Sequence, residues 1–233
     1  MFTETFVEKT ALFGSEERKY LFHMPESYDE NKKYPVVLFL HGAGERGDDN
    51  FAQLRIGIGT ALEDENSPLH NAFIIAPQVP LEKQWVAIPW INGNYLVDEL
   101  EETPYLAGAI DIVRDTLKSY NADEKKVFVM GISMGGYGSW DALARHPELF
   151  VGGFICCGGA DLTKAHIFKE KTIFTYHGNC DDVVPCFGTQ NVVKAIKEAG
   201  GDKITYREYD GMNHWTWDRA YAEYDDINAL FNA

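Results

Sequence analysis

The sequence predicts an α/β fold with a mostly parallel, twisted sheet and helices on both faces. Short apolar runs alternate with longer amphipathic stretches along the chain, and several of these runs are apolar without interruption, as strands buried on both faces are. The expected strands are residues 34–40, 72–76, 126–130, 153–157, 172–176 and 204–209. An antiparallel hairpin over residues 2–24, turning near Phe13-Gly14-Ser15, is expected before them.

Helices are expected where apolar residues recur at i, i+3 and i+4 spacing. Thr103 caps the first of them, Pro147 closes the second, and Gly200-Gly201 ends the third. The expected helices are residues 104–120, 134–146, 187–199 and 217–231. The segment 85–102 is rich in Trp, Asn and Gly and predicts a long loop, whereas 160–171 predicts a loop with a short helix.

Length and charge narrow the classes of function. The 233 residues fit a single domain over residues 1–233, and the formal net charge of −15 repels nucleic acid and anionic membrane surfaces. The first ten residues lack the basic start and apolar run of a signal peptide, and no apolar stretch is long enough to span a membrane. The four cysteines do not have common zinc-site spacing, so we expect a reduced, cytoplasmic protein without a metal.

The strongest chemical signal is Gly131-Ile132-Ser133-Met134-Gly135. This GxSxG motif follows a predicted strand and opens a predicted helix, as a nucleophile elbow requires. The glycines leave room for a tight turn, and the helix N-terminus favours negative charge beside the serine. The motif indicates Ser133 as a nucleophile; the alternative is an ordinary turn serine.

A serine nucleophile needs a base and an acid that orients the base, and in such folds the chain order is Ser, then Asp or Glu, then His. His214 follows the last predicted strand and is the expected base, while Asp181 and Asp182 follow the strand at 172–176. One aspartate would face the histidine and the other solvent, because two adjacent buried carboxylates raise each other's pKa. His177 is interpreted as part of a turn that shapes the acid loop.

The segment 41–47 (HGAGERG) directly follows the strand at 34–40. Backbone N–H groups of Ala43 and Met134 are expected to form an oxyanion hole. The same glycines match a dinucleotide-binding fingerprint, with acidic residues 63–65 near the ribose distance. A nucleotide-binding oxidoreductase is less favoured, because a loop follows Gly47 and the acidic residues precede the next strand.

The motifs together resemble the esterase/phospholipase-like and "predicted peptidase" group of α/β-hydrolases, which is related to feruloyl-esterase-like and dienelactone-hydrolase-like enzymes. The segments YPVVLFLHGAGERGDDN, FIIAPQVP, KVFVMGISMGGYGSWDALARHPELF, TYHGNCDDVVP and GMNHWTWDRAY carry the resemblance, in the family's order. The resemblance implies Asp181 as the acid and His214 as the base. It implies no particular acyl group.

These residues predict a serine esterase that cleaves a small-molecule ester by two-step acyl transfer, without cofactor or metal. Asp181 follows Ser133 by only 48 positions, too few for a large lid. Aromatic side chains crowd the expected loops, and Trp85 and Trp215 are expected to contact substrate, with Trp90, Tyr95 and Trp217 nearby. We therefore expect short or aromatic acyl groups. The alternatives are a peptidase with the same triad, an inactive binding protein, and aromatic residues that merely pack the loops.

Overall fold

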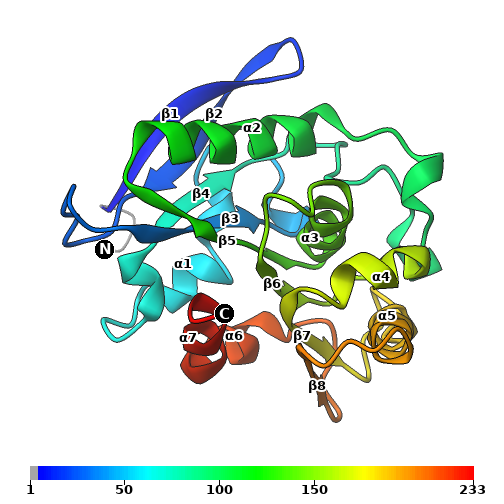
Figure 1. Cartoon of the computed structure of the whole chain (residues 1–233). Helices are drawn as coiled ribbons and strands as arrows, with labels where there is room; N and C mark the ends of the chain where they lie inside the picture. Colours follow the sequence, from blue (N-terminus) through cyan, green and yellow to red (C-terminus); the bar gives the residue numbers. More distant parts are fainter. Residues whose placement is uncertain (1–4) are drawn as a thin grey trace.

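The chain folds around one twisted sheet, which a computed structural model describes over residues 5–233 (Figure 1). Its strand order is β1-β2-β4-β3-β5-β6-β7-β8. The first two strands form an antiparallel hairpin, β2 also pairs antiparallel with β4, and all other pairs are parallel. The strands are β1 (Phe6–Phe13), β2 (Glu16–His23), β3 (Tyr34–Leu40), β4 (Phe73–Pro77), β5 (Ala122–Ile132), β6 (Gly152–Cys156), β7 (Thr172–Gly178) and β8 (Ile204–Tyr209). This confirms the predicted mostly parallel α/β fold.

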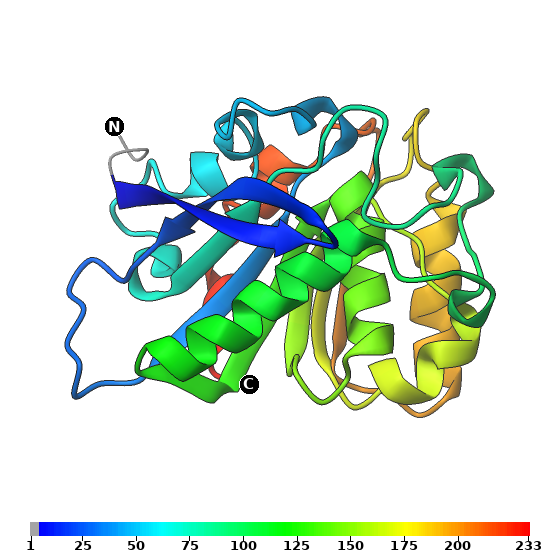
Figure 2. The same ribbon diagram turned by 90° about the horizontal axis from the view of Figure 1, so that it is seen from above.

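Side-chain alternation along the buried strands produces two hydrophobic cores. In β3, Val36, Leu38 and Leu40 face the core that packs against α2, α3 and α5, while Val37 and Phe39 face the core under α1, α6 and α7. Figures 1 and 2 show α2 and α3 on one side of the sheet and the red C-terminal helix on the other. The helices are α1 (Ile58–Ala61), α2 (Pro104–Ser119), α3 (Met134–Arg145), α4 (Ala165–Phe168), α5 (Phe187–Glu198), α6 (Trp217–Ala220) and α7 (Tyr224–Phe231).

The predicted hairpin is confirmed, although its predicted first residues, 2–4, lie outside the described part of the chain. The single helix predicted over 217–231 is wrong, because a turn at residues 221–223 divides it into α6 and α7. Tyr221 lies in this turn, almost fully buried against the edges of Phe39 and Phe154. Burying this ring fixes the chain between the two helices.

The loops contain short 3-10 turns: η2 (Ala43–Glu45), η3 (Ala52–Leu54), η4 (Pro68–Asn71), η5 (Trp90–Asn92), η6 (Val97–Glu99) and η7 (Leu162–Lys164). Across residues 5–233, no helix combines the length and the apolar character needed to cross a bilayer. Because β3 and β5–β8 are parallel, the loops that follow them meet at one edge of the sheet, where ligands bind in open α/β folds.

Candidate active site

Ser133 lies at the sharp turn between β5 and α3. Its backbone has φ 53° and ψ −116°, a strained conformation for a residue with a side chain, and its N–H donates to the Cys156 carbonyl at 2.9 Å. The turn packs so tightly that a Cβ at Gly135 would collide with the carbonyl oxygen of Leu40. The glycines of the motif are therefore required by close backbone approach.

A continuous chain of hydrogen bonds joins three side chains beside this turn. Ser133 Oγ lies 2.8 Å from His214 Nε2, and His214 Nδ1 lies 2.6 Å from Asp181 Oδ2. The other carboxylate oxygen, Oδ1, accepts from the N–H groups of Val183 at 2.9 Å and Val184 at 2.8 Å. This arrangement can move a proton from the serine to the imidazole while the carboxylate holds the ring in place.

Asp181 binds a second histidine. His177 is fully buried, and its Nε2 lies 3.0 Å from Asp181 Oδ2 and 3.1 Å from the Val184 carbonyl. Because Nε2 faces two oxygen acceptors, it carries a hydrogen. Its Nδ1 lies 2.7 Å from Thr189 Oγ1, which in turn lies 2.7 Å from the Gly158 carbonyl. The predicted role of His177 in shaping the acid loop corresponds to these contacts.

The environment of Asp181 keeps it ionised. Burial alone would raise the pKa of this carboxyl, but hydrogen bonds from His177, His214 and the Val184 N–H hold the pKa well below its usual value. Asp182, its neighbour in sequence, is exposed. The structure thus directs Asp181, and not Asp182, toward the histidine.

Cys157 lies close to the same carboxylate. The ligand atoms of Cys157, Asp181 and His214 all lie within 4.8 Å of one another. Burial raises the pKa of the Cys157 thiol, and its Sγ lies 2.9 Å from Thr216 Oγ1, so the sulfur is a protonated hydrogen-bonding group. A protonated thiol beside an Asp–His hydrogen bond suits a proton network better than a metal site.

The loop after β3 is held by two buried side chains. His41 Nδ1–H donates to the Gly42 carbonyl at 2.6 Å, and its Nε2 accepts from the Val79 N–H at 2.9 Å. Burial lowers the pKa of His41 to about 4, so the ring is neutral as this pattern requires. Trp85 Nε1 donates to the His41 carbonyl at 3.0 Å. These bonds fix the strand end from which Ala43 follows.

The two expected oxyanion donors occupy helix starts near the serine. Ala43 is the first residue of η2 and lines the cleft that contains Ser133, and Met134 is the first residue of α3. The first N–H groups of a helix have no partner within the helix, so they are available to an anion.

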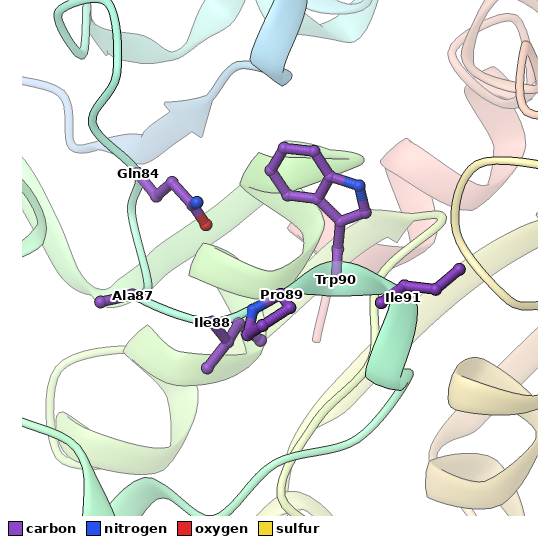
Figure 3. Close-up of a pocket in the computed structure, with 6 residues that line it drawn as sticks. All are labelled: Gln84, Ala87, Ile88, Pro89, Trp90 and Ile91. Atoms are coloured by element: carbon purple, nitrogen blue, oxygen red, sulfur yellow. The ribbon is translucent and has the colours of Figure 1, made fainter.

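The cleft over Ser133 has a volume of about 190 Å³ and is largely apolar. The residues that line it are Gly42, Ala43, Gly44, Glu45, Ile56, Trp90, Ile132, Ser133, Val183, His214, Trp215 and Trp217. Trp90 also lines a second cavity of about 540 Å³, together with Gln84, Ala87, Ile88, Pro89 and Ile91 (Figure 3). In Figure 3 the Trp90 indole projects from this segment in a different direction from the Ile88 side chain.

The expected substrate contact at Trp85 requires correction. Its side chain is fully buried and holds the His41 carbonyl, so it is not open to a substrate. Trp90 lies in the cleft instead, and Trp215 lines it as expected. Glu45 also lines the cleft, although the motif at 41–47 predicts only backbone N–H donors there. Its position two residues after an expected oxyanion donor was the available signal.

Comparisons with known proteins identify the family of this chain. The phospholipase/carboxylesterase family model matches residues 27–226. The chain is 22% identical over 196 residues to carboxylesterase SOBER1 of Arabidopsis thaliana, covering 76% of this chain and 82% of that protein.

Solved structures are also similar. A thermostable esterase superposes with a TM-score of 0.86 at 33% identity, covering 99% of this chain, which spans 64% of that protein's length. A ferulic acid esterase of Anaeromyces mucronatus superposes with a TM-score of 0.61 at 18% identity, covering 97% of this chain and 91% of that one. Because the family model matches most of its length, the chain belongs to the phospholipase/carboxylesterase family of α/β-hydrolases.

Proposed function

We propose that this protein is a serine esterase, which cleaves carboxylic esters through an acyl-enzyme on Ser133. The observation that carries the proposal is the unbroken hydrogen-bond chain from Ser133 Oγ through His214 to Asp181. Three side chains of the required types, in the required order and at these distances, have a specific use in acyl transfer.

In the first step, Ser133 Oγ attacks the ester carbonyl carbon while His214 Nε2 takes the hydroxyl proton. Asp181 stabilises the resulting imidazolium and keeps Nδ1 protonated. The carbonyl oxygen becomes an oxyanion held by the N–H groups of Ala43 and Met134. When the intermediate collapses, the ester C–O bond breaks and the alcohol leaves with the proton from His214.

In the second step, water attacks the acyl-enzyme and His214 accepts a proton from it. Collapse of the second tetrahedral intermediate breaks the bond to Ser133 Oγ, which regains its proton, and the acid is released. The cleft of about 190 Å³, with its tryptophan walls, supports short or aromatic acyl groups as substrates.

Substitution of the nucleophile tests the proposal. Ser133→Ala should lower kcat for p-nitrophenyl acetate by about 10⁴-fold or more, because no other group can form the acyl-enzyme. A fluorophosphonate probe should label the parent and not the variant. Ser27→Ala is a matched control, because Ser27 is exposed and lies before β3, and it should keep both activity and labelling.

Labelling that survives in Ser133→Ala would exclude Ser133 as nucleophile. A parallel assay of peptide p-nitroanilides separates esterase from peptidase activity, since the same triad can cleave both bonds. A higher kcat/KM on the anilides than on matched esters would favour the peptidase.

A further inference from the structure

The cleft over Ser133 combines one carboxylate with three tryptophan side chains. Glu45, Trp90, Trp215 and Trp217 all line it, together with the nucleophile. The described residues that line it include no Lys or Arg. A small cavity with an acidic group and aromatic walls differs in chemistry from a purely apolar acyl site.

Glu45 lies close to the reacting atoms. A Cβ added at Gly42 would be 2.9 Å from Glu45 Oε2 and 3.6 Å from the Ser133 Cβ, so the carboxylate and the nucleophile flank the same glycine. Burial raises the pKa of Glu45, and hydrogen bonds from the Gly42 and Glu45 N–H groups oppose that rise. His214 and Arg55 also act on this carboxyl electrostatically.

Glu45 forms no salt bridge in the part of the chain that the structure describes. Among the salt bridges of residues 5–233, none within 4.0 Å includes Glu45, and the nearby Arg55 pairs instead with Asp49 at 3.7 Å. The adjacent Arg46 donates to the carbonyls of Ala43 and Lys83. The half-buried carboxylate can therefore accept a positive charge from a bound molecule.

The tryptophan rings also have no cation–π partner among the described residues. The rings of Trp217 and His214 are nearly perpendicular, with centroids 5.2 Å apart, and Trp215 packs against Trp217 at 4.6 Å. Each cation–π pair in the described part of the chain uses a Phe or Tyr ring, none a Trp. Trp is the best aromatic partner for an alkylammonium ion, and aromatic walls beside a carboxylate recognise such cations.

The charge of Glu45 also affects the reaction. A carboxylate beside a developing oxyanion opposes its formation, because the two negative charges repel in a partly dry cleft. A substrate that brings a positive charge to Glu45 removes this repulsion in the transition state.

We propose that the cleft selects esters that carry an alkylammonium group near the scissile carbonyl, with Glu45 as its ionic partner and Trp90, Trp215 and Trp217 as its walls. The inference rests on the proposed esterase function and names the substrate class of the same site. Glu45 is then a specificity-determining residue.

A matched pair of esters tests this. Choline acetate and 3,3-dimethylbutyl acetate have nearly the same shape and differ by one positive charge, so the change in the ratio of their kcat/KM values on Glu45→Gln measures recognition of that charge. The parent should prefer the choline ester by about 10-fold or more, and Glu45→Gln should reduce the ratio to within about 3-fold of unity. Glu124→Gln removes the same charge from an exposed site at the opposite end of β5 and should keep the parental ratio.

Equal rates on the two esters in the parent, or a preference that survives Glu45→Gln, would overturn the inference. If the parent hydrolyses both esters at equal rates, the result contradicts the proposed substrate class but not the proposed esterase function. A parent that hydrolyses neither these esters nor p-nitrophenyl acetate contradicts the proposed function itself.

A second measurement needs no variant. Tetramethylammonium should inhibit p-nitrophenyl acetate hydrolysis by the parent competitively, at a concentration about 10-fold lower than neopentanol, a neutral compound of similar size and branching. Equal inhibition by the two compounds would show that the cleft binds shape and not charge, and would reject the proposal.

Discussion

At the scale of single residues, Asp181 is the most constrained group of the site. Its two oxygens have four hydrogen-bond donors: two backbone N–H groups on Oδ1 and the imidazoles of His177 and His214 on Oδ2. These donors stabilise the ionised carboxylate despite its burial. The position of the base is therefore set by a group that can neither rotate nor readily protonate.

Neighbouring aspartates provide a matched pair of variants. Asp181→Asn should lower kcat by about 10⁴-fold, because an amide cannot fix the His214 tautomer or stabilise the imidazolium. Asp182→Asn changes an exposed carboxylate and should leave kcat within about 3-fold of the parent. Steady-state rates on p-nitrophenyl acetate measure both. If Asp182→Asn is the more damaging variant, the acid of the triad has been misassigned.

At the scale of elements, α7 is attached to the sheet by one buried carboxylate. Asp226 on α7 accepts from Arg207 on β8 through two bonds of 2.7 Å, and from the Tyr176 hydroxyl on β7 at 2.7 Å. Burial would raise the pKa of Asp226, but the bonds from Arg207 and Tyr176 lower it overall. This attachment holds the last helix across the strands whose loops carry Asp181 and His214.

Asp226→Asn should destabilise the fold by about 1–2 kcal/mol at pH 7, because the substitution removes the ion pair with Arg207. The loss is limited because half-exposed Arg207 regains some hydration. A carboxyl whose pKa is lowered by folding contributes stability above its unfolded pKa, and the contribution disappears as the pH falls through the folded value. The difference between parent and variant in urea unfolding should thus be full at pH 7 and shrink steadily below about pH 4. A difference that persists unchanged at pH 2 would contradict this origin.

At the scale of the whole molecule, helices cover both faces of the sheet, and the catalytic loops lie at the carboxyl ends of its parallel strands. The cleft at the ends of these strands is small, and the chain between Ser133 and Asp181 contributes α3, β6, η7, α4 and β7 but no covering domain. Nothing in this segment extends the cleft to the length of a fatty acyl chain.

The acyl group should therefore be short. We expect kcat/KM for p-nitrophenyl acetate and butyrate to exceed that for the palmitate by about 10-fold or more, because a long acyl chain does not fit within the cleft of about 190 Å³ over Ser133. A feruloyl ester tests the aromatic alternative, and Ser133→Ala corrects each rate for spontaneous hydrolysis. Palmitate as the fastest substrate would move the enzyme toward the lipases.

The alternation of apolar runs with amphipathic stretches and the GxSxG motif predict most of this architecture, since both are local features of the sequence. The choice between Asp181 and Asp182 cannot be predicted from such local features, because adjacent residues share one sequence context. Only the turn in the folded chain directs one of the two side chains inward. Trp85 and Trp90 are similarly indistinguishable within an aperiodic loop, yet one is buried and the other lines the cleft. The motif at 41–47 indicates a role for backbone N–H groups only, so it does not predict that the Glu45 carboxylate lies in the cleft.

The convergence of loops at the sheet edge has a consequence for folding kinetics. Ser133 and His214 are 81 positions apart, and β5, β6, β7 and β8 must all be paired before the two can meet. Contacts of such long range form late, because closing the intervening chain costs entropy that only the assembled sheet recovers. Recovered catalysis after dilution from denaturant would then follow the slowest phase of refolding, after the recovery of helical circular dichroism.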